Sequence, residues 1–507
     1  MLRRDVNLNK AESYQLPGVV RTPSRFKNPI GKYRLHRSSA CTACGKCVEL
    51  CPYEVHVVRR GKVFIENHHL CVGNDCPDPC HKACPEGALT LRRNPNFDGL
   101  GDARWPADLL ASTWHMAEFG KVPEKGLEYK LGASGGGFDK LRIVFKKKVK
   151  AVAEIPDDEF DLGVVLNRRN DNAHRVRIKV PFYGGGMSYG SVSITTMLSR
   201  IKAAVALGTF CCTGEGGYPD ELKPYDDHVI TQVATGLFGV REETIQRVKI
   251  VEFKYAQGAK PGLGGHLLGD KVTPGVARMR EAVVGYPLFS PFPFHSVYSV
   301  EDHKKHVDWI KAMNPKALVS VKVSTPTDVD MVAVGSYYAG AHIIHLDGSY
   351  GGTGAAPDIA KKNIAMPLEY ALPKVHQFLT EEGVRDKLTV IASGGIRNPH
   401  DVAKAIALGA DGICTGTADL VALECIRCHK CESGRGCARG IATTDAELME
   451  LIRMEWGTQR IVNMFLAWRT ELIRILRKLG MTSLKELVGR TDCLTHIDYI
   501  KKMPKVS

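Results

Sequence analysis

Residues 388–443 read LTVIASGGIRNPHDVAKAIALGADGICTGTADLVALECIRCHKCESGRGCARGIAT, and this stretch decides the fold. Two short apolar runs, Leu388–Ala392 and Asp411–Cys414, each end in a glycine loop, Ser393-Gly394-Gly395 and Thr415-Gly416-Thr417. Glycines there let backbone N–H groups point at one anion, and the start of a following helix adds its positive dipole end. The pattern predicts the phosphate site that follows the last two strands of a (β/α)8 barrel.

The second half of the same stretch carries four cysteines, Cys425, Cys428, Cys431 and Cys437. A nucleotide-phosphate site followed directly by an iron–sulfur type of cysteine cluster indicates flavin redox chemistry. A barrel end with incidental glycines is the alternative, and it explains the glycines but not the cysteines.

Composition and charge narrow the class of protein. The chain has 507 residues, of which 44% are hydrophobic and 24% charged, an ordinary globular composition. No apolar run approaches the ~18 residues of a membrane span, and the amino terminus lacks the apolar segment of a signal peptide, so we expect a cytoplasmic protein that does not bind membranes. The net charge is +14, but no nucleic-acid-binding motif accompanies it. A basic surface would attract acidic partners such as ferredoxins, or would simply be solvated.

Eight of the 16 cysteines fall between Cys41 and Cys84. The run CTACGKCVELCP (41–52) has the spacing of a bacterial ferredoxin, in which the fourth cysteine reaches the other cluster. The second run is spaced more widely, which leaves the occupancy of its cluster open. We expect a small α+β ferredoxin-like domain with two [4Fe–4S] clusters. The first would be held by Cys41, Cys44, Cys47 and Cys84, and the second by Cys51, Cys71, Cys76 and Cys80.

From residue 170 onward, short apolar strands alternate with amphipathic helices, as in an α/β barrel. The strand candidates are Arg177–Pro181, Ile250–Lys254, Ala317–Val323, His342–Leu346, Leu388–Ala392 and Gly412–Cys414. The predicted organisation is an N-terminal extension (1–37), the ferredoxin-like domain (38–93), a linker and lead-in (94–169), the barrel with its iron–sulfur loop 425–437 (170–443), and C-terminal helices (444–507).

Four segments resemble the FMN- and iron–sulfur-containing synthase domain of glutamate synthase: VEFKYAQGAKPGLGGHLLGDKV (251–272), HLDGSYGGTGAAP (345–357), CIRCHKCESGRGCARGIAT (425–443) and LRKLGMTSLKELVGRTD (476–492). With the N-terminal cysteine module added, the layout is similar to the short, archaeal-type members of that family. We expect no counterpart of the family's amidotransferase domain, because no cysteine stands at position 1 or 2, and the sequence shows no convincing nicotinamide fingerprint.

The resemblance implies that the barrel binds FMN. A cation near the flavin ring stabilises its anionic reduced form, which gives Lys254 a role; the alternative is an ordinary surface charge after a strand. The implied positions are Gly185, Met187, Ser188 and Gly190 along the flavin, Gln232 and Lys254 near its ring, and Ser393, Gly394, Gly395, Gly416 and Thr417 at its phosphate.

The resemblance also implies a dicarboxylate substrate. Lys260 and Arg280 match the family's 2-oxoglutarate contacts, and we expect their neighbours Arg278 and Lys271 to be ordinary surface charges. Glu215 matches an acidic residue at the ammonia entry, where a carboxylate could accept a proton; a loop-capping carboxylate is the alternative. Glu215 and Lys260 are the candidate catalytic residues. His266 stands where the family has a substrate-contacting glutamine, which leaves the choice of 2-oxo acid open.

The third cysteine group departs from the family pattern. Cys425, Cys431 and Cys437 match the three ligands of a [3Fe–4S] cluster, whereas Cys428 is additional and makes a [4Fe–4S] cluster equally compatible. The remaining cysteines, Cys211, Cys212, Cys414 and Cys493, are interpreted as buried thiols.

The implied activity is the reductive amination of 2-oxoglutarate with ammonia to L-glutamate through 2-iminoglutarate. Reduced FMN would be the hydride source, and electrons would arrive through the clusters. We expect an oligomer that works with a separate glutaminase (amidotransferase) subunit and with ferredoxin or a reductase subunit as electron donor. Two alternatives remain open: an N-methylglutamate-synthase-type enzyme, and an electron-transfer subunit without its own substrate turnover.

Overall fold

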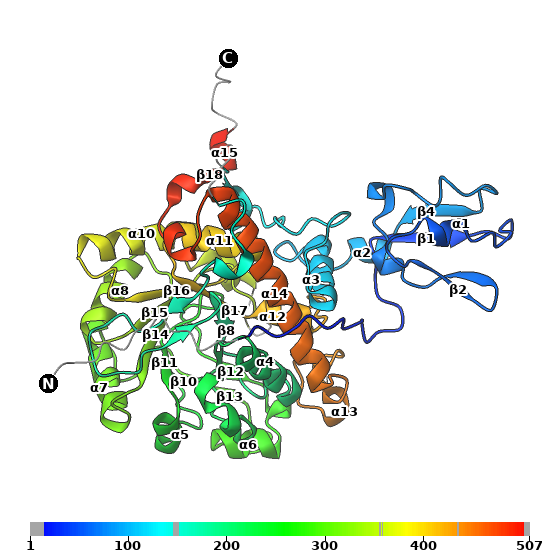
Figure 1. The fold of residues 1–507 in the computed structure, drawn as a ribbon. Helices are drawn as coiled ribbons and strands as arrows, with labels where there is room; N and C mark the ends of the chain where they lie inside the picture. Colours follow the sequence, from blue (N-terminus) through cyan, green and yellow to red (C-terminus); the bar gives the residue numbers. More distant parts are fainter. Residues whose placement is uncertain (1–14, 146–151, 354–355, 357, 433–434, 501–507) are drawn as a thin grey trace.

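The larger part of the chain forms a closed barrel of eight parallel strands in the computed structural model (Figure 1). The structure describes residues 15–145, 152–353, 356, 358–432 and 435–500, so parts of the predicted N-terminal extension, of the loop 345–357 and of the cysteine loop 425–437 lie outside the described residues. Around the barrel the strands are β10 Val229–Ala234, β11 Ile250–Lys254, β14 Leu318–Ser324, β15 Ile343–Asp347, β16 Thr389–Ser393, β17 Gly412–Thr415, β8 Phe182–Gly184 and β9 Cys211–Cys212. The predicted (β/α)8 barrel is confirmed.

The barrel strands are rich in β-branched residues because both of their faces are buried. All seven residues of β14 (LVSVKVS) and all six of β10 (VITQVA) are buried. Apolar side chains fill the interior at the amino ends of the strands, including Ile230, Ile250 and Leu318. Two residues further along, the inward side chains become polar. These polar side chains therefore form the floor of the barrel mouth.

One predicted barrel strand, Arg177–Pro181, is wrong. The structure has a short strand, β7 Arg177–Ile178, that pairs antiparallel with β6 Val164–Val165 outside the barrel. The barrel strand β8 begins directly after Pro181, whose carbonyl accepts a hydrogen bond from the backbone N–H of Ile413. Proline has no N–H to donate to a ladder, so regular pairing on both sides starts only after it.

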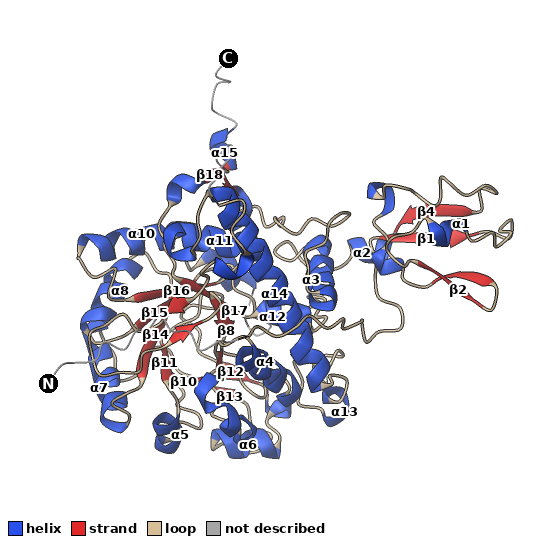
Figure 2. Cartoon of the chain, in the orientation of Figure 1, coloured by secondary structure: helices blue, strands red, loops and turns tan. Residues whose placement is uncertain are grey.

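Helices surround the barrel (Figure 2). Those that follow barrel strands are α4 Ile194–Ala206, α5 Glu242–Arg247, α7 His303–Met313, α8 Val329–Tyr338, α9 Asp358–Asn363, α10 Leu368–Glu381, α11 Pro399–Ala407 and α12 Thr417–Ala422. The predicted C-terminal helices are α13 Ala446–Met449, α14 Met454–Leu479 and the short α15 Ile497–Ile500. Helix α14 packs against α4, and Gly457 permits the close approach, since a Cβ there would lie 2.5 Å from the Ser199 hydroxyl. Among the described residues, no helix is both long and apolar enough to cross a membrane.

A small unit with two two-stranded antiparallel sheets projects from the barrel (Figure 1). Strand β1 Tyr33–Arg37 pairs with β4 Leu89–Arg93, and β2 His56–Arg59 pairs with β3 Lys62–Ile65; the unit also contains α1 Lys46–Glu49.

The segment that follows this unit, predicted as a linker, packs onto the barrel. It carries α2 Pro95–Asp98 and α3 Ala107–Phe119, and α3 lies against α14 and α12. Its strand β5 Leu141–Ile143 pairs with β18 Leu494–His496.

Candidate active site

A large cavity opens at the carboxyl ends of the barrel strands, with a volume of roughly 1620 Å³ including the part open to solvent. Barrel enzymes carry their chemistry on this face. Gly190 does not line the cavity; it lies behind the wall, where an added Cβ would be 3.1 Å from the Leu267 side chain. The other residues predicted to bind the cofactor do line it: Gly185, Met187, Ser188, Gln232, Lys254, Ser393, Gly394, Gly395, Gly416 and Thr417.

The glycines of this wall present bare backbone to the cavity. Gly394 and Gly395 have left-handed φ angles of 104° and 85°, which disfavour any residue with a Cβ. A Cβ at Gly394 would lie 2.5 Å from the Gly348 carbonyl oxygen, and one at Gly185 would lie 2.9 Å from that of Thr415. At Gly416 no atom lies within 4 Å of an added Cβ, so its face is open. The wall therefore has the form of an anion cradle.

Glu252 lies behind the cavity lining, almost completely buried on β11 and in contact with Gln232, which does line the cavity. Its carboxylate accepts hydrogen bonds from Gln232 Nε2 (2.7 Å) and the Ser320 hydroxyl (3.1 Å), and it lies 2.9 Å from His345 Nδ1. Burial opposes ionisation, but His345 and these hydrogen bonds lower the pKa of Glu252 to about 2. Glu252 is therefore ionised at neutral pH, just behind the cavity lining.

Lys322 is a functional candidate that sequence reasoning missed. It is buried on β14, lines the cavity, and pairs with Asp347 at 3.4 Å. Asp347 also accepts a hydrogen bond from the Ser393 hydroxyl, which lies 2.8 Å from His345 Nε2. Burial favours the neutral amine, yet Asp347 and Glu252 raise the pKa of Lys322. The signal that could have identified it is a single charged residue inside an otherwise uncharged strand.

Three cations and one carboxylate gather at the other side of the cavity. Lys254 Nζ lies 3.2 Å from Glu215, and Lys260 and Arg280 line the same wall. Burial alone would raise the pKa of Glu215, but Lys254 and Lys260 lower it. Burial, together with Lys254, lowers the pKa of Lys260, and burial lowers that of Arg280 to about 10. The cluster keeps an excess of positive charge.

The loop after β11 positions these cations. It carries Lys260, the hairpin of β12 His266–Leu267 with β13 Leu288–Phe289, and helix α6 Pro274–Arg280. Arg280 is buried and donates to the Ser188 hydroxyl at 2.8 Å, while its Nε has no hydrogen-bond partner within the described chain. His266 lines the cavity and stacks on the ring of Phe289.

The structure corrects the expectation for Lys271. Arg278 is exposed, as predicted. Lys271 is instead buried, donates to the Cys431 carbonyl at 2.7 Å and pairs with Glu432 at 3.3 Å. The reason is tertiary: the segment after β12 folds over the cysteine loop, so Lys271 connects the predicted substrate loop to that loop.

The eight N-terminal cysteines lie around two small cavities, each of roughly 350 Å³. The structure groups them as the ferredoxin pattern suggests. The first cavity is lined by Cys41, Cys44, Cys47 and Cys84, and the second by Cys51, Cys71, Cys76 and Cys80. Among the residues the structure describes, no three Cys, His, Asp or Glu side chains converge as the ligands of a single metal ion.

The third cysteine group borders the cavity at the carboxyl ends of the barrel strands. Cys425 and Cys431 line that cavity, whereas Cys428 is exposed. Burial raises the pKa of Cys425 to about 11, and the neighbouring Cys431 and Cys437 add to the effect. Metal binding would remove these protons, because only the thiolate is a ligand.

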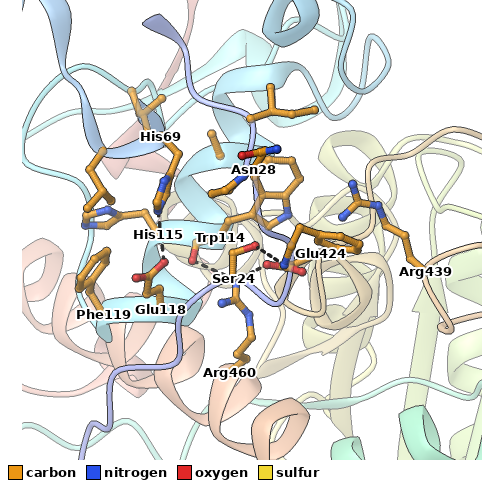
Figure 3. Close-up of a pocket in the computed structure, with 16 residues that line it drawn as sticks. Ser24, Asn28, His69, Trp114, His115, Glu118, Phe119, Glu424, Arg439 and Arg460 are labelled. Carbon is orange, nitrogen blue, oxygen red and sulfur yellow. Dashed lines mark hydrogen bonds and ion pairs between the residues drawn. The ribbon is translucent and has the colours of Figure 1, made fainter. Parts of the chain in front are cut away.

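A second cavity, of roughly 790 Å³ including its open part, lies between the N-terminal unit and the barrel. Figure 3 shows Trp114 between His69 and His115 on one side and Glu424 and Arg439 on the other. His69 lies two residues before Cys71, and Glu424 directly precedes Cys425. The cavity therefore separates the second cysteine group from the third.

Comparison with known proteins agrees with this architecture. Residues 139–482 match the family described as the conserved region in glutamate synthase. The archaeal-type glutamate synthase [NADPH] of Thermotoga maritima is 38% identical over 478 residues, which cover 90% of this chain and 92% of the relative. The archaeal glutamate synthase [NADPH] of Methanocaldococcus jannaschii is 36% identical over 512 residues, 96% of this chain and 98% of the relative.

A mutant flavocytochrome b2 with bound pyruvate superposes with a TM-score of 0.44 at 16% identity, covering 73% of this chain and 80% of that one. The barrel assignment rests on the strand pairing rather than on that likeness. By the extent and identity of its sequence matches, the chain belongs to the glutamate synthase family.

Proposed function

We propose that the chain catalyses the reductive amination of 2-oxoglutarate with ammonia to L-glutamate. The observation that carries this proposal is the cluster of Lys254, Lys260 and Arg280 around the single carboxylate of Glu215, beside a glycine-lined anion cradle. A dicarboxylate needs fixed cations, and arginine can bind a carboxylate through two parallel hydrogen bonds. Family membership supports the same reaction.

The cavity fits FMN by its shape and its donors. Gly394, Gly395, Gly416 and Thr417 would hold the phosphate, because all four line the cavity directly after the last two barrel strands. Gly185, Met187 and Ser188 would lie along the flavin, with Gln232, Lys254 and Lys322 near its ring. FMN, when bound, supplies the hydride that reduces a carbon–nitrogen double bond.

The chain's own residues would bind the substrates and move protons. Lys260 and Arg280 hold the carboxylates of 2-oxoglutarate, and their burial strengthens each interaction. Ammonia condenses at the 2-oxo carbon, water leaves, and 2-iminoglutarate remains. Glu215, kept ionised by Lys254 and Lys260, can accept the proton of an ammonium ion. His266 would contact the substrate and influence which 2-oxo acid fits.

The three cysteine groups would hold iron–sulfur clusters: two [4Fe–4S] clusters in the N-terminal unit, and one [3Fe–4S] or [4Fe–4S] cluster at residues 425–437. The clusters would supply one-electron transfer, which a flavin can convert into a hydride. Because residues next to Cys71 and Cys425 line opposite walls of one cavity, the second group would be the one that faces the barrel. The electron donor would be ferredoxin or a nicotinamide-oxidising reductase, and a separate glutaminase would deliver ammonia.

The test is an anaerobic assay of the full chain loaded with FMN and clusters, using dithionite, 2-oxoglutarate and ammonium. We expect glutamate to form. If the flavin is reduced but no glutamate appears, the chain is an electron-transfer subunit. In a parallel reaction supplied with glutamate and methylamine, formation of N-methylglutamate without glutamate synthesis in the first assay would support the N-methylglutamate-synthase alternative.

Two arginines of helix α6 provide a matched pair for the same assay. Arg280→Met removes a buried cation from the cavity and should raise the KM for 2-oxoglutarate about 10- to 100-fold, the worth of one charged hydrogen bond. Arg278→Met changes an exposed residue two positions away and should leave the KM unchanged. An equal effect of both substitutions would contradict the assignment of Arg280.

A further inference from the structure

A short segment before α3 closes one side of the large cavity at the carboxyl ends of the barrel strands. Asp102 accepts hydrogen bonds at Oδ1 from the backbone N–H groups of Arg104 (2.9 Å) and Trp105 (2.8 Å), and Trp105 lines the cavity. The carboxylate thereby fixes the turn that precedes the helix. Its second oxygen, Oδ2, takes no part in this turn.

That second oxygen binds the cysteine loop. Arg427 donates to it from Nε (3.1 Å) and Nη2 (2.9 Å), and His429 Nε2 lies 2.9 Å away. Burial would raise the pKa of Asp102, but Arg427 and the backbone donors lower it. Arg427 and His429 both have a left-handed backbone with a φ of 58°, which is uncommon for residues with a Cβ. Asp102 therefore holds the loop in a specific conformation.

One nitrogen of the Arg427 guanidinium, Nη1, is not used by Asp102. The side chain is 13% exposed and lines the cavity wall. Within the part of the chain that the structure describes, Nη1 takes part in no hydrogen bond, and it would lie 3.3 Å from a Cβ at Gly352. The Thr417 hydroxyl would clash with the same added Cβ. Nη1 and the hydroxyl thus face one small space beside Gly352.

Two of the other cations that border this cavity, Arg397 and Lys322, already have carboxylate partners. Arg397 is bound by Asp139 and Asp401, both of which are buried. Lys322 pairs with Asp347. Arg427 also has a carboxylate partner, but Asp102 occupies only the Nε and Nη2 edge of its planar fork. The remaining edge can therefore bind a second anion.

We propose that Arg427, oriented by Asp102, binds the phosphate group of FMN together with Thr417 and the glycines of the cradle. The inference rests on the proposed function, because it takes FMN as the occupant of the cavity. Arg427 stands between Cys425 and Cys428, so the loop that would hold the third cluster also provides a flavin ligand. Ordering of that loop and binding of the flavin phosphate are then linked.

The test distinguishes binding of the FMN phosphate from binding of the flavin ring. Flavin-free full-length protein is titrated with FMN and with riboflavin, and binding is followed by quenching of flavin fluorescence. The wild type should bind FMN more tightly than riboflavin. Arg427→Met should weaken FMN binding about 10- to 100-fold, the worth of a charge-assisted hydrogen bond, and leave riboflavin binding unchanged. Arg427→Lys should retain part of the FMN preference.

Arg435→Met is the matched control. Arg435 belongs to the same loop, but its side chain is 59% exposed and is paired with Asp445 and Glu447, so both affinities should be unchanged. If the wild type shows no preference for FMN, the proposed cofactor itself is wrong. If it shows the preference and Arg427→Met keeps it, only the role of Arg427 is overturned. Equal loss of FMN and riboflavin would assign Arg427 a structural role and overturn the proposal as well.

Discussion

Lys322 has an environment that makes its charge structurally necessary. It lies on a fully buried strand and pairs with Asp347, close to the equally buried Glu252. An ion pair taken out of water contributes little net stability, because desolvation offsets the attraction. Removing one partner is strongly destabilising, because the remaining charges stay buried without compensation.

Replacing Lys322 by methionine should therefore destabilise the barrel by about 3–5 kcal/mol. Urea unfolding followed by far-ultraviolet circular dichroism measures this change. The control is Lys249→Met, which removes a lysine one residue before β11 whose ion pair with Asp227 is largely exposed; it should cost at most about 1 kcal/mol. Similar losses in the two variants would show that the Lys322 charge is not required for stability.

At the scale of elements, His342 connects the barrel strands β14 and β15 to the loop between β6 and β7. It directly precedes β15, and its Nδ1 accepts a hydrogen bond from the backbone N–H of Val319 on β14. Its Nε2 lies 2.8 Å from Asp171, in the loop between β6 and β7. Since Nδ1 accepts, the ring is neutral and Nε2 carries the proton. Burial and the charge of Lys311 lower the pKa of His342 to about 4.

This depressed pKa predicts a loss of stability in mild acid. The unfolded histidine takes up a proton below about pH 6.5, whereas the folded one does so only near pH 4, so the stabilising contribution present above pH 6.5 is lost between these values. At pH 5.5 the loss is about 1.4 kcal/mol relative to pH 7.5. Thermal unfolding at the two pH values measures it.

The variant His342→Asn keeps an acceptor for the Val319 N–H but has no titrating group. Its stability should fall about 1.4 kcal/mol less than that of the wild type between pH 7.5 and 5.5. His36→Asn, a change at an exposed histidine, should behave like the wild type. The same pH dependence in the wild type and His342→Asn would refute the assignment.

For the whole molecule, Arg460 of α14 is the residue that attaches the N-terminal segments to the barrel. It is almost fully buried and donates to three carbonyl groups: Ala422 at 2.7 Å, Thr22 at 2.6 Å and Trp114 at 3.3 Å. These carbonyls belong to the barrel, the N-terminal extension and α3. Arg460 also lines the cavity of Figure 3, between the second and third cysteine groups.

Arg460→Met should therefore loosen the docking of the N-terminal unit. Three carbonyls would lose a donor, and limited proteolysis should cleave the N-terminal extension around residues 15–31 faster than in the wild type. Arg474→Met, on the same helix but 56% exposed at its side chain, is the control and should not change the cleavage rate. An unchanged digestion pattern for Arg460→Met would mean that other contacts fix the unit.

Much of this molecule can be predicted from local patterns. Five barrel strands, including Ile250–Lys254 to the residue, follow from apolar runs that end in glycine or polar loops. The glycines at 394, 395 and 416 predict the cradle because each of its two parts lies in one short loop, directly after a predicted strand. Strands β9 and β10 escape prediction, since β9 has only two residues and β10 contains Thr231 and Gln232.

The sequence by itself determined the barrel, the anion cradle after its last two strands and the spacing of three cysteine groups, because neighbouring residues encode each of them. Only the tertiary structure decided which charges meet: Lys322 with Asp347, Lys271 with the cysteine loop, and Asp102 with Arg427 across 325 positions. The physical reason is that an ion pair depends on distance in space and on burial. A local pattern contains neither, so a lysine expected at the surface becomes a buried connection once the chain is folded.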